Sequence, residues 1–119
     1  MACMPKALPV IDVSPPVCCA PVAAAPMDED AAVEVALRLK ALADPVRLRV
    51  LSLLLTRDEA CTCDLAPAVG VSDATLSHHI GQLRRAGFVE SQRRGMNVFH
   101  RVRRDTLAAL CHVIDPACC

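Results

Sequence analysis

The sequence predicts a mainly α-helical domain with one small β-hairpin, arranged as a winged helix-turn-helix. Three observations predict this fold. Apolar residues recur at helical spacing, a tight Gly-containing turn separates two helical segments, and a Gly/Asn turn separates two strand-like segments. At 119 residues the chain has room for one modest core, and two Phe with no Trp or Tyr leave aliphatic side chains to build it.

The N-terminal half is predicted to hold a flexible arm and two helices. Residues 1–27 are rich in Pro and Ala and show little periodicity, which is typical of an arm. "MDEDAAVEVALRLKALA" predicts a helix that is apolar nearly all round, with acidic residues at its positive end. The next helix has the clearest start, because Asp44 can cap it and Pro45 occupies its first position, where a missing N–H is harmless.

The C-terminal half is predicted to hold the helix-turn-helix and the wing. A short helix at about 62–69 and a longer one at 73–86, capped by Ser72 and stopped by Gly87, flank the turn. "FVESQRR-GMN-VFHRVR" predicts the hairpin, and a last helix is expected at about 105–113. The predicted order is therefore α-α-α-α-β-β-α.

These elements predict an arm at 1–27, one DNA-binding and dimerisation domain at 28–115 and a Cys-containing tail at 116–119. No apolar run approaches the ~18–20 residues that a membrane helix needs, and prolines and Asp12 interrupt the region where a signal peptide would be apolar. We expect a cytoplasmic protein without membrane contact. The sequence has no C-x-x-C, phosphate-binding Gly loop or recognisable Cys-His-acid set, so we expect no catalysis.

The net charge of zero conceals a strong asymmetry along the chain. Residues 74–104 hold seven Arg and one Glu, a charge of +6, whereas residues 1–46 hold three basic and six acidic side chains, a charge of −3. One concentrated Arg-rich segment in a near-neutral chain is typical of a protein that binds nucleic acid.

The helix at 73–86 is the predicted DNA-reading helix. Leu76, Ile80 and Leu83 form its apolar face, and the opposite face carries small and polar groups that can enter a major groove and bond base edges. An ordinary surface helix would also have a polar face, but the adjoining Arg-bearing hairpin favours DNA, because a wing would follow the phosphate backbone. The predicted DNA-binding residues are Ser72, Thr75, Ser77, His78, Gln82, Arg85, Arg93 and Arg94.

The cysteines stand in groups. They are Cys18-Cys19, Cys61-x-Cys63, Cys111 with Cys118-Cys119, and Cys3 alone. In a reducing cytoplasm such clusters bind soft metals or do redox chemistry more often than they form a disulfide scaffold. At the first turn of a helix both sulfurs of a CxC pair can be brought to one side, and the helix N-terminus favours the thiolate that binds metal. The alternative is that one or both are small buried hydrophobes.

Four blocks of the sequence resemble the ArsR/SmtB family of metal-sensing repressors. They are "LKALADPVRLRVLSLL", "CTCDLA", "VSDATLSHHIGQLRRAGFV" and "RRGMNVFHRV", in the family's order over roughly residues 35–104. The resemblance implies a homodimer held by the two terminal helices. It also implies binding to a two-fold, double-stranded operator DNA and release when metal binds.

The resemblance further implies an inducer site at Cys61 and Cys63, because "CVCD"-like sequences form one in this family. Cys18 and Cys19 resemble the arm thiolates of its cadmium/lead-sensing branch and the vicinal pair of some arsenic sensors. Trivalent arsenic takes three thiolates and cadmium prefers four, so four candidate donors leave the ion open. The likeness to arsenic-resistance regulators favours As(III) as inducer. A Cd(II) or Pb(II) sensor and a thiol-oxidation-sensing repressor are the alternatives.

The C-terminal cysteines leave two readings open. Cys111, Cys118 and Cys119 would form a separate three-thiolate cluster, or Cys111 would be buried beside a tail that binds nothing. The family's zinc site on the last helix is not expected, because Leu107 stands where its first His would be.

Overall fold

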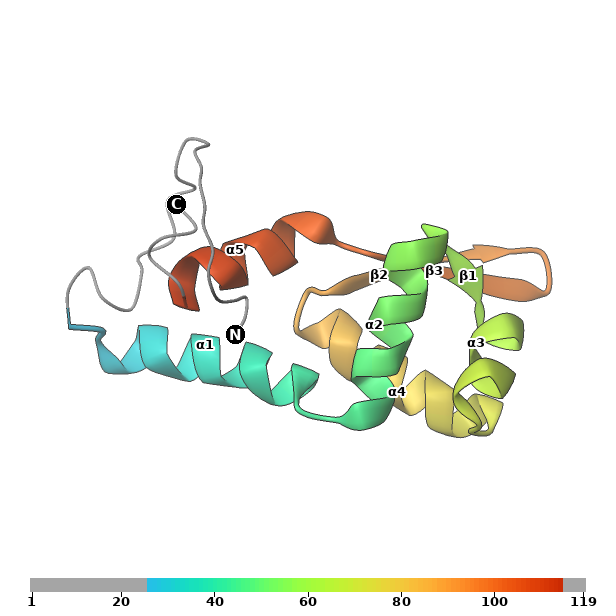
Figure 1. The fold of residues 1–119 in the computed structure, drawn as a ribbon, viewed down its shortest axis with the longest axis horizontal. Helices are drawn as coiled ribbons and strands as arrows, with labels where there is room; N and C mark the ends of the chain where they lie inside the picture. Colours follow the sequence, from blue (N-terminus) through green and yellow to red (C-terminus); the bar gives the residue numbers. More distant parts are fainter. Residues whose placement is uncertain (1–25, 115–119) are drawn as a thin grey trace.

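The computed structural model describes residues 26–114; most of the predicted arm and the whole predicted tail, in residues 1–25 and 115–119, lie outside the described residues. Within that range the chain forms five helices and three strands (Figure 1). They are α1 Glu29–Leu42, α2 Pro45–Arg57, β1 Ala60–Cys61, α3 Thr62–Val69, α4 Asp73–Arg85, β2 Val89–Arg94, β3 Asn97–Val102 and α5 Arg104–Ile114. The predicted mainly α-helical fold with a β-hairpin is confirmed.

The helices begin where short-range capping predicts. The Asp44 carboxylate accepts the Val46 and Arg47 N–H groups at 2.8 and 3.2 Å, with Pro45 at the first position of α2. The Ser72 hydroxyl accepts the Thr75 N–H at 3.1 Å at the start of α4. The ends differ slightly from prediction, since α4 stops at Arg85 and α5 spans Arg104–Ile114.

The sheet has three strands, in the order β1-β3-β2, and β1 corrects the predicted element order. Ala60 lies opposite His100 and Cys61 lies opposite Phe99, so β1 pairs with the wing in antiparallel register. The hairpin ladder runs from Val89 opposite Val102 to its tip. The residues that lead into α3 are therefore hydrogen-bonded to the wing.

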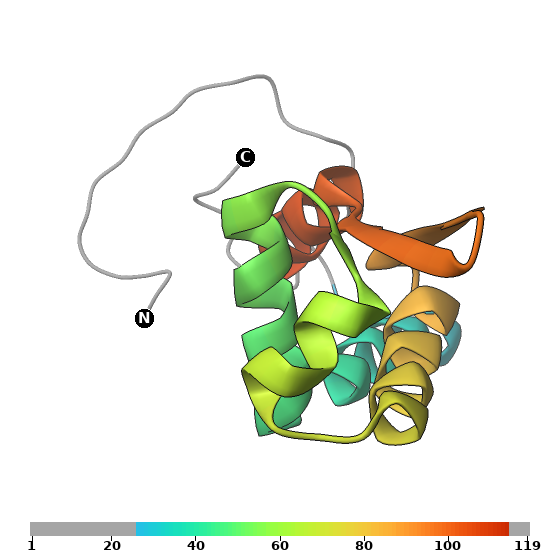
Figure 2. The same ribbon diagram turned by 90° about the vertical axis from the view of Figure 1, so that its right-hand side faces the viewer.

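The core lies between α2, α3, α4 and the sheet (Figure 2). The residues that the sequence placed on the apolar face of α4 are all buried in it, as are aliphatic residues from α2 and α3. Its largest fully buried side chains are Phe88, Leu54, Leu65, Leu76, Ile80, Leu83, Val50 and Val89. This core fixes α3, α4 and the hairpin relative to one another.

The two terminal helices lie at the opposite end of the molecule from the hairpin tip (Figure 1). A cleft of about 310 Å³ separates them, lined by α1 and α5 residues that include Val35 and Leu110. Helix α1 exposes Val33, Leu37 and Leu39 to solvent. Among residues 26–114, no helix is both long and apolar enough to cross a membrane.

Candidate metal site and nucleic-acid interface

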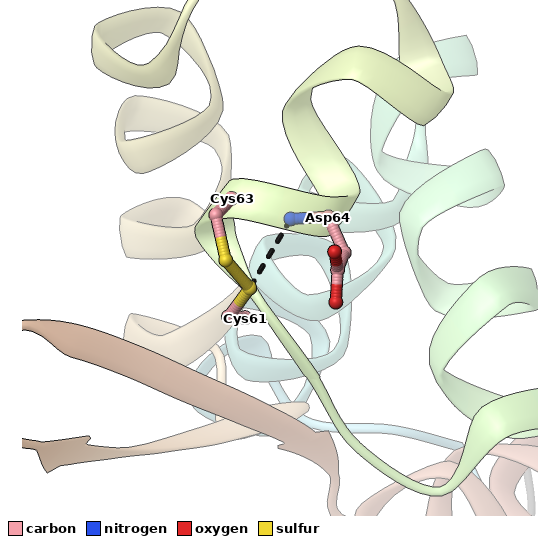
Figure 3. Close-up of side chains that lie close together, drawn as sticks. All are labelled: Cys61, Cys63 and Asp64. Atoms are coloured by element: carbon pink, nitrogen blue, oxygen red, sulfur yellow. Dashed lines mark hydrogen bonds between the residues drawn. A yellow bond between two sulfur atoms is a disulfide. The ribbon is translucent and has the colours of Figure 1, made fainter.

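Cys61 and Cys63 meet at the first turn of α3 (Figure 3). Their Cα atoms are 5.1 Å apart, and the structure joins their sulfurs in a disulfide. Cys61 is only 3% exposed, whereas Cys63 lies at the surface. The expected convergence of the two sulfurs at a helix start is therefore present. The buried partner belongs to β1 and the exposed one to α3.

Cys61 is also the N-cap of α3. Its Sγ accepts the Asp64 N–H at 3.2 Å, in the position that a serine or aspartate oxygen usually occupies (Figure 3). A helix N-terminus that donates to sulfur stabilises the thiolate. Possible ligand atoms of Cys61, Cys63 and Asp64 all lie within 4.8 Å of one another. In the reduced state two soft donors and one carboxylate can thus meet a single ion.

The first turn of α3 lacks one helical hydrogen bond. Pro67 lies inside the helix and has no N–H to donate to the carbonyl of Cys63, four residues earlier. The backbone at the cysteine pair is therefore held less tightly than in an ordinary helix.

The other two predicted metal ligands, Cys18 and Cys19, lie outside the described residues, as do Cys3, Cys118 and Cys119. Cys111 is exposed on α5, which is contrary to the reading that it is buried. On the same helix, Leu107 packs against the core and Asp105 bonds Arg103 at 2.9 Å.

The polar face of α4 presents the predicted base-reading side chains. Ser77 and His78 are exposed and Gln82 is half-buried, opposite the buried leucines. Ser72 and Thr75 are also exposed, and their hydroxyls bond each other at 3.0 Å. Basic side chains are added at the end of the helix, where Arg84 and Arg85 are exposed.

Arginines of α2 contact the helices that surround it. The Arg47 side chain donates to the Ala41 carbonyl at 2.6 Å and lies 3.1 Å from His79 Nδ1. Arg49 donates to the Ala68 carbonyl at 3.1 Å, at the end of α3. His79 therefore contacts α2, and His78 is left to face solvent.

The two arginines at the wing tip, Arg93 and Arg94, differ in their ion pairs. Arg93 is exposed and, within residues 26–114, has no ion pair. Arg94 donates to both oxygens of Glu59, at 2.6 and 3.0 Å, and lies over the Phe99 ring. Arg101 donates to the same carboxylate at 3.1 Å. Hydrogen bonds from Arg94 and Arg101 hold the pKa of Glu59 below its ordinary value. The Arg94 guanidinium is therefore already paired with a carboxylate, whereas that of Arg93 is not, in the part of the chain that the structure describes.

Two polar residues that were not among the predicted functional residues organise this region, Glu59 and the buried His100. His100 is 4% exposed and bonds Thr62, which lies between the two cysteines, and Ser91 of β2. The alternation Val98, His100, Val102 along β3 places this imidazole on the inward face, which was the available signal.

Comparison with known proteins gives a consistent set of matches. The family model "Bacterial regulatory protein, arsR family" matches residues 44–91. A transcriptional repressor SmtB homolog of Synechocystis sp. is 45% identical over 74 residues, 62% of this chain and 55% of that protein. The cadmium resistance regulatory protein CadC of Listeria innocua is 38% identical over 64 residues, 54% of each chain. The arsenic resistance regulator ArsR1 of Pseudomonas putida is 38% identical over 63 residues, 53% of this chain and 49% of that protein. The chain spans about half the length of these relatives.

Solved structures match over more of their length. The AntR antimony-specific transcriptional repressor has a TM-score of 0.63 and 30% identity, over 72% of this chain and 78% of that one. The homodimeric winged helix-turn-helix DNA-binding domain of Mb0332 from Mycobacterium bovis, described as a possible ArsR-family regulator, has a TM-score of 0.61 and 32% identity. That match covers 75% of this chain and 84% of the other.

Proposed function

This chain belongs to the ArsR family of bacterial regulatory proteins, and on that premise we propose that it is a metal-responsive transcriptional repressor. In this proposal it binds double-stranded operator DNA as a homodimer and leaves it when thiolates bind the inducer. The family and the fold are those of DNA-binding transcriptional regulators and not of enzymes. A DNA partner also favours a cytoplasmic location.

The observation that carries the proposal is the position of the cysteine pair. Cys61 and Cys63 lie at the start of the first helix of the helix-turn-helix, with Cys61 paired to the wing through β1. Helix α3 packs on the DNA-reading helix α4 and on α2 through the buried core. An ion bound at this point therefore acts directly on the elements that would hold DNA.

We propose As(III) as the inducer, with Cd(II) or Pb(II) as the alternative. Both classes of ion prefer thiolates, so the choice depends on how many are available. The described residues supply two at this site, Cys61 and Cys63, and Asp64 adds a harder oxygen. Cys18 and Cys19 are the proposed further donors from the arm. Relatives named for arsenic and for cadmium, and a structure named for antimony, support a soft ion without choosing one.

The proposed homodimer uses α1 and α5. Both helices expose apolar side chains that a second copy can cover, Val33, Leu37 and Leu39 on α1 and Ile114 on α5. A homodimeric structure with 32% identity supports a dimer. Two-fold symmetry would then place two copies of α4 on successive major grooves, ~34 Å apart.

The test is a metal titration of the reduced dimer on an operator obtained by selection from random DNA. Arsenite, cadmium and lead are added separately, and operator release is followed by fluorescence anisotropy. Without Trp or Tyr, the near-ultraviolet thiolate–metal bands are unobscured. We expect arsenite to release the operator at the lowest concentration, with affinity reduced about 5- to 150-fold. A lower effective concentration of cadmium or lead would reassign the inducer, and no release by any ion would contradict metal response.

The second candidate is a thiol-oxidation-sensing repressor, and one observation favours it. The Cys61 and Cys63 sulfurs are near enough to be joined, and the exposed Cys63 is accessible to an oxidant. Release by a mild oxidant with metals chelated, reversed by dithiothreitol alone, would support this candidate over metal binding.

The proposed division of the DNA surface predicts two kinds of loss. Changing His78 or Gln82 to Ala should weaken binding only to operators with particular bases, by ~1–3 kcal/mol for a bidentate contact. Arg93→Ala should weaken binding to all sequences alike and lower the salt dependence, because it removes a phosphate contact. Affinity measured on point-mutated operators at several salt concentrations separates the two. Uniform losses from all three changes would contradict the assignment of α4 as the reading helix.

A further inference from the structure

A chain of hydrogen-bonded polar side chains, buried at His100 and exposed at Arg84, links the cysteine pair to the DNA-reading helix. Thr62 Oγ1 lies 2.9 Å from His100 Nε2, and Ser91 Oγ lies 2.7 Å from His100 Nδ1. The Arg84 guanidinium donates to the same Ser91 hydroxyl at 3.2 Å. We call these four residues the relay. It crosses from α3 through β3 and β2 to the last turn of α4.

The relay depends on His100, the buried polar residue of the core region. Burial lowers the pKa of its ring, and the Arg84 charge lowers it further, so the ring is neutral near neutral pH. A neutral imidazole has one donor and one acceptor nitrogen. Since Arg84 can only donate, Ser91 can accept from it and donate to Nδ1, which leaves Nε2–H to donate to Thr62. Each hydrogen bond of the relay then has one donor and one acceptor.

The relay begins at the point that a bound ion must disturb. Thr62 is the residue between Cys61 and Cys63, so its backbone is shared by both donors. An ion held by both sulfurs lies between them, and each metal–sulfur bond is about 2.3 Å long in thiolate sites such as those of zinc. That geometry excludes a direct bond between the sulfurs. The loop from Cys61 through Thr62 to Cys63 is then closed by the ion, and its conformation differs from that of the disulfide form described here. Because Pro67 removes the helical bond of Cys63, the turn is free to adjust.

The relay ends where a small change alters DNA contact. Arg84 bonded to Ser91 ties the end of α4 to β2, the first strand of the wing. Reading helix and wing must contact the same duplex together. Losing this tie changes their relative position without unfolding either one.

We propose that His100 is a positioning residue that couples occupancy of the cysteine pair to the DNA-reading helix through Thr62, Ser91 and Arg84. This inference rests on the proposed function, because it supplies the mechanism by which a bound ion lowers operator affinity. A ligand shifts the DNA equilibrium only if it interacts differently with the free and bound states. In this account the Thr62–His100 bond is intact with DNA bound and is broken when the ion binds.

The test compares Thr62→Val, which keeps the side-chain shape and removes the hydroxyl, with Thr62→Ser, which keeps the hydroxyl. Each reduced protein is assayed for arsenite and cadmium affinity without DNA, and for operator affinity with and without each ion. We expect Thr62→Val to bind both ions without DNA at least as tightly as the wild type, because the ion no longer has to break this bond. The ion-induced loss of operator affinity should shrink about fivefold, as for one ordinary hydrogen bond. Thr62→Ser should retain the wild-type loss.

A second variant and a spectroscopic readout keep the test decisive. Ser91→Ala breaks the relay on the other side of His100 and should show the same uncoupling, even if Thr62→Val fails to fold. The ring nitrogen resonances of His100 should shift on addition of the ion in the wild type and in Thr62→Ser, but not in Thr62→Val. If Thr62→Val and Ser91→Ala both fold and still leave the operator as readily as the wild type when the ion is added, the relay is overturned. Failure of the wild type itself to leave the operator would instead overturn the proposed function, and the relay with it.

Discussion

A protein with serine at both Cys61 and Cys63 is expected to stay on its operator at every arsenite, cadmium or lead concentration that releases the wild type. Serine removes the soft donors, and its oxygen does not replace sulfur for these ions. The ion-induced loss of affinity, about 5- to 150-fold in typical allosteric proteins, should fall to none. Anisotropy titrations of the labelled operator measure this directly.

Operator affinity without metal should change little in the same protein. Serine is a strong N-cap, so Ser at position 61 can accept the Asp64 N–H that the sulfur accepts now. Cys63 is exposed, and Cys63→Ser alone removes one donor without touching the core. Cys63→Ser is therefore the cleaner single variant, since Cys61 is buried.

Two controls sharpen this prediction. Cys111→Ser changes an exposed cysteine on α5, far along the chain from the pair, and should leave release unchanged. Cys18→Ser and Cys19→Ser should reproduce the loss of release if the arm donates ligands. Wild-type release by the protein that lacks both Cys61 and Cys63 would remove this site from the mechanism.

Local signals in the sequence predicted most of the fold. Caps at Asp44 and Ser72 act over two or three residues, so the sequence alone contains the whole interaction. The apolar face of α4 was equally predictable, because a helix of 13 residues repeats its pattern several times. The convergence of the cysteine pair followed from its place at a helix start.

The missed features all depend on residues far apart in the sequence. Strand β1 is two residues long, too short for any periodic pattern, and exists because β3 pairs with it. The Thr62–His100 bond and the Arg94–Glu59 ion pair span 38 and 35 residues. No local pattern encodes such partners. Arg94, predicted as a phosphate contact from its place in the hairpin, is held by a carboxylate that only the folded chain brings near.

Val33→Glu is expected to convert the protein to a monomer and to reduce operator affinity by about 100-fold or more. Val33 is 52% exposed on α1, in the surface proposed to pair with a second copy. Two-fold symmetry would place the new carboxylate in the interface twice, and an unpaired buried charge is strongly destabilising. Losing the linked second half-site removes an avidity factor of about 10²–10⁴.

Leu48→Glu is the matched control for this change. Leu48 is 53% exposed, so it has the same exposure and receives the same charge, but it lies on α2 outside both terminal helices. Sedimentation at micromolar concentration should find a dimer for the wild type and for Leu48→Glu, and a monomer for Val33→Glu. The Val33→Glu monomer should still fold, because Val33 is outside the core that fixes α3, α4 and the wing. A dimeric Val33→Glu protein would place the interface elsewhere, and a monomeric wild type would remove the basis for two-fold operator binding.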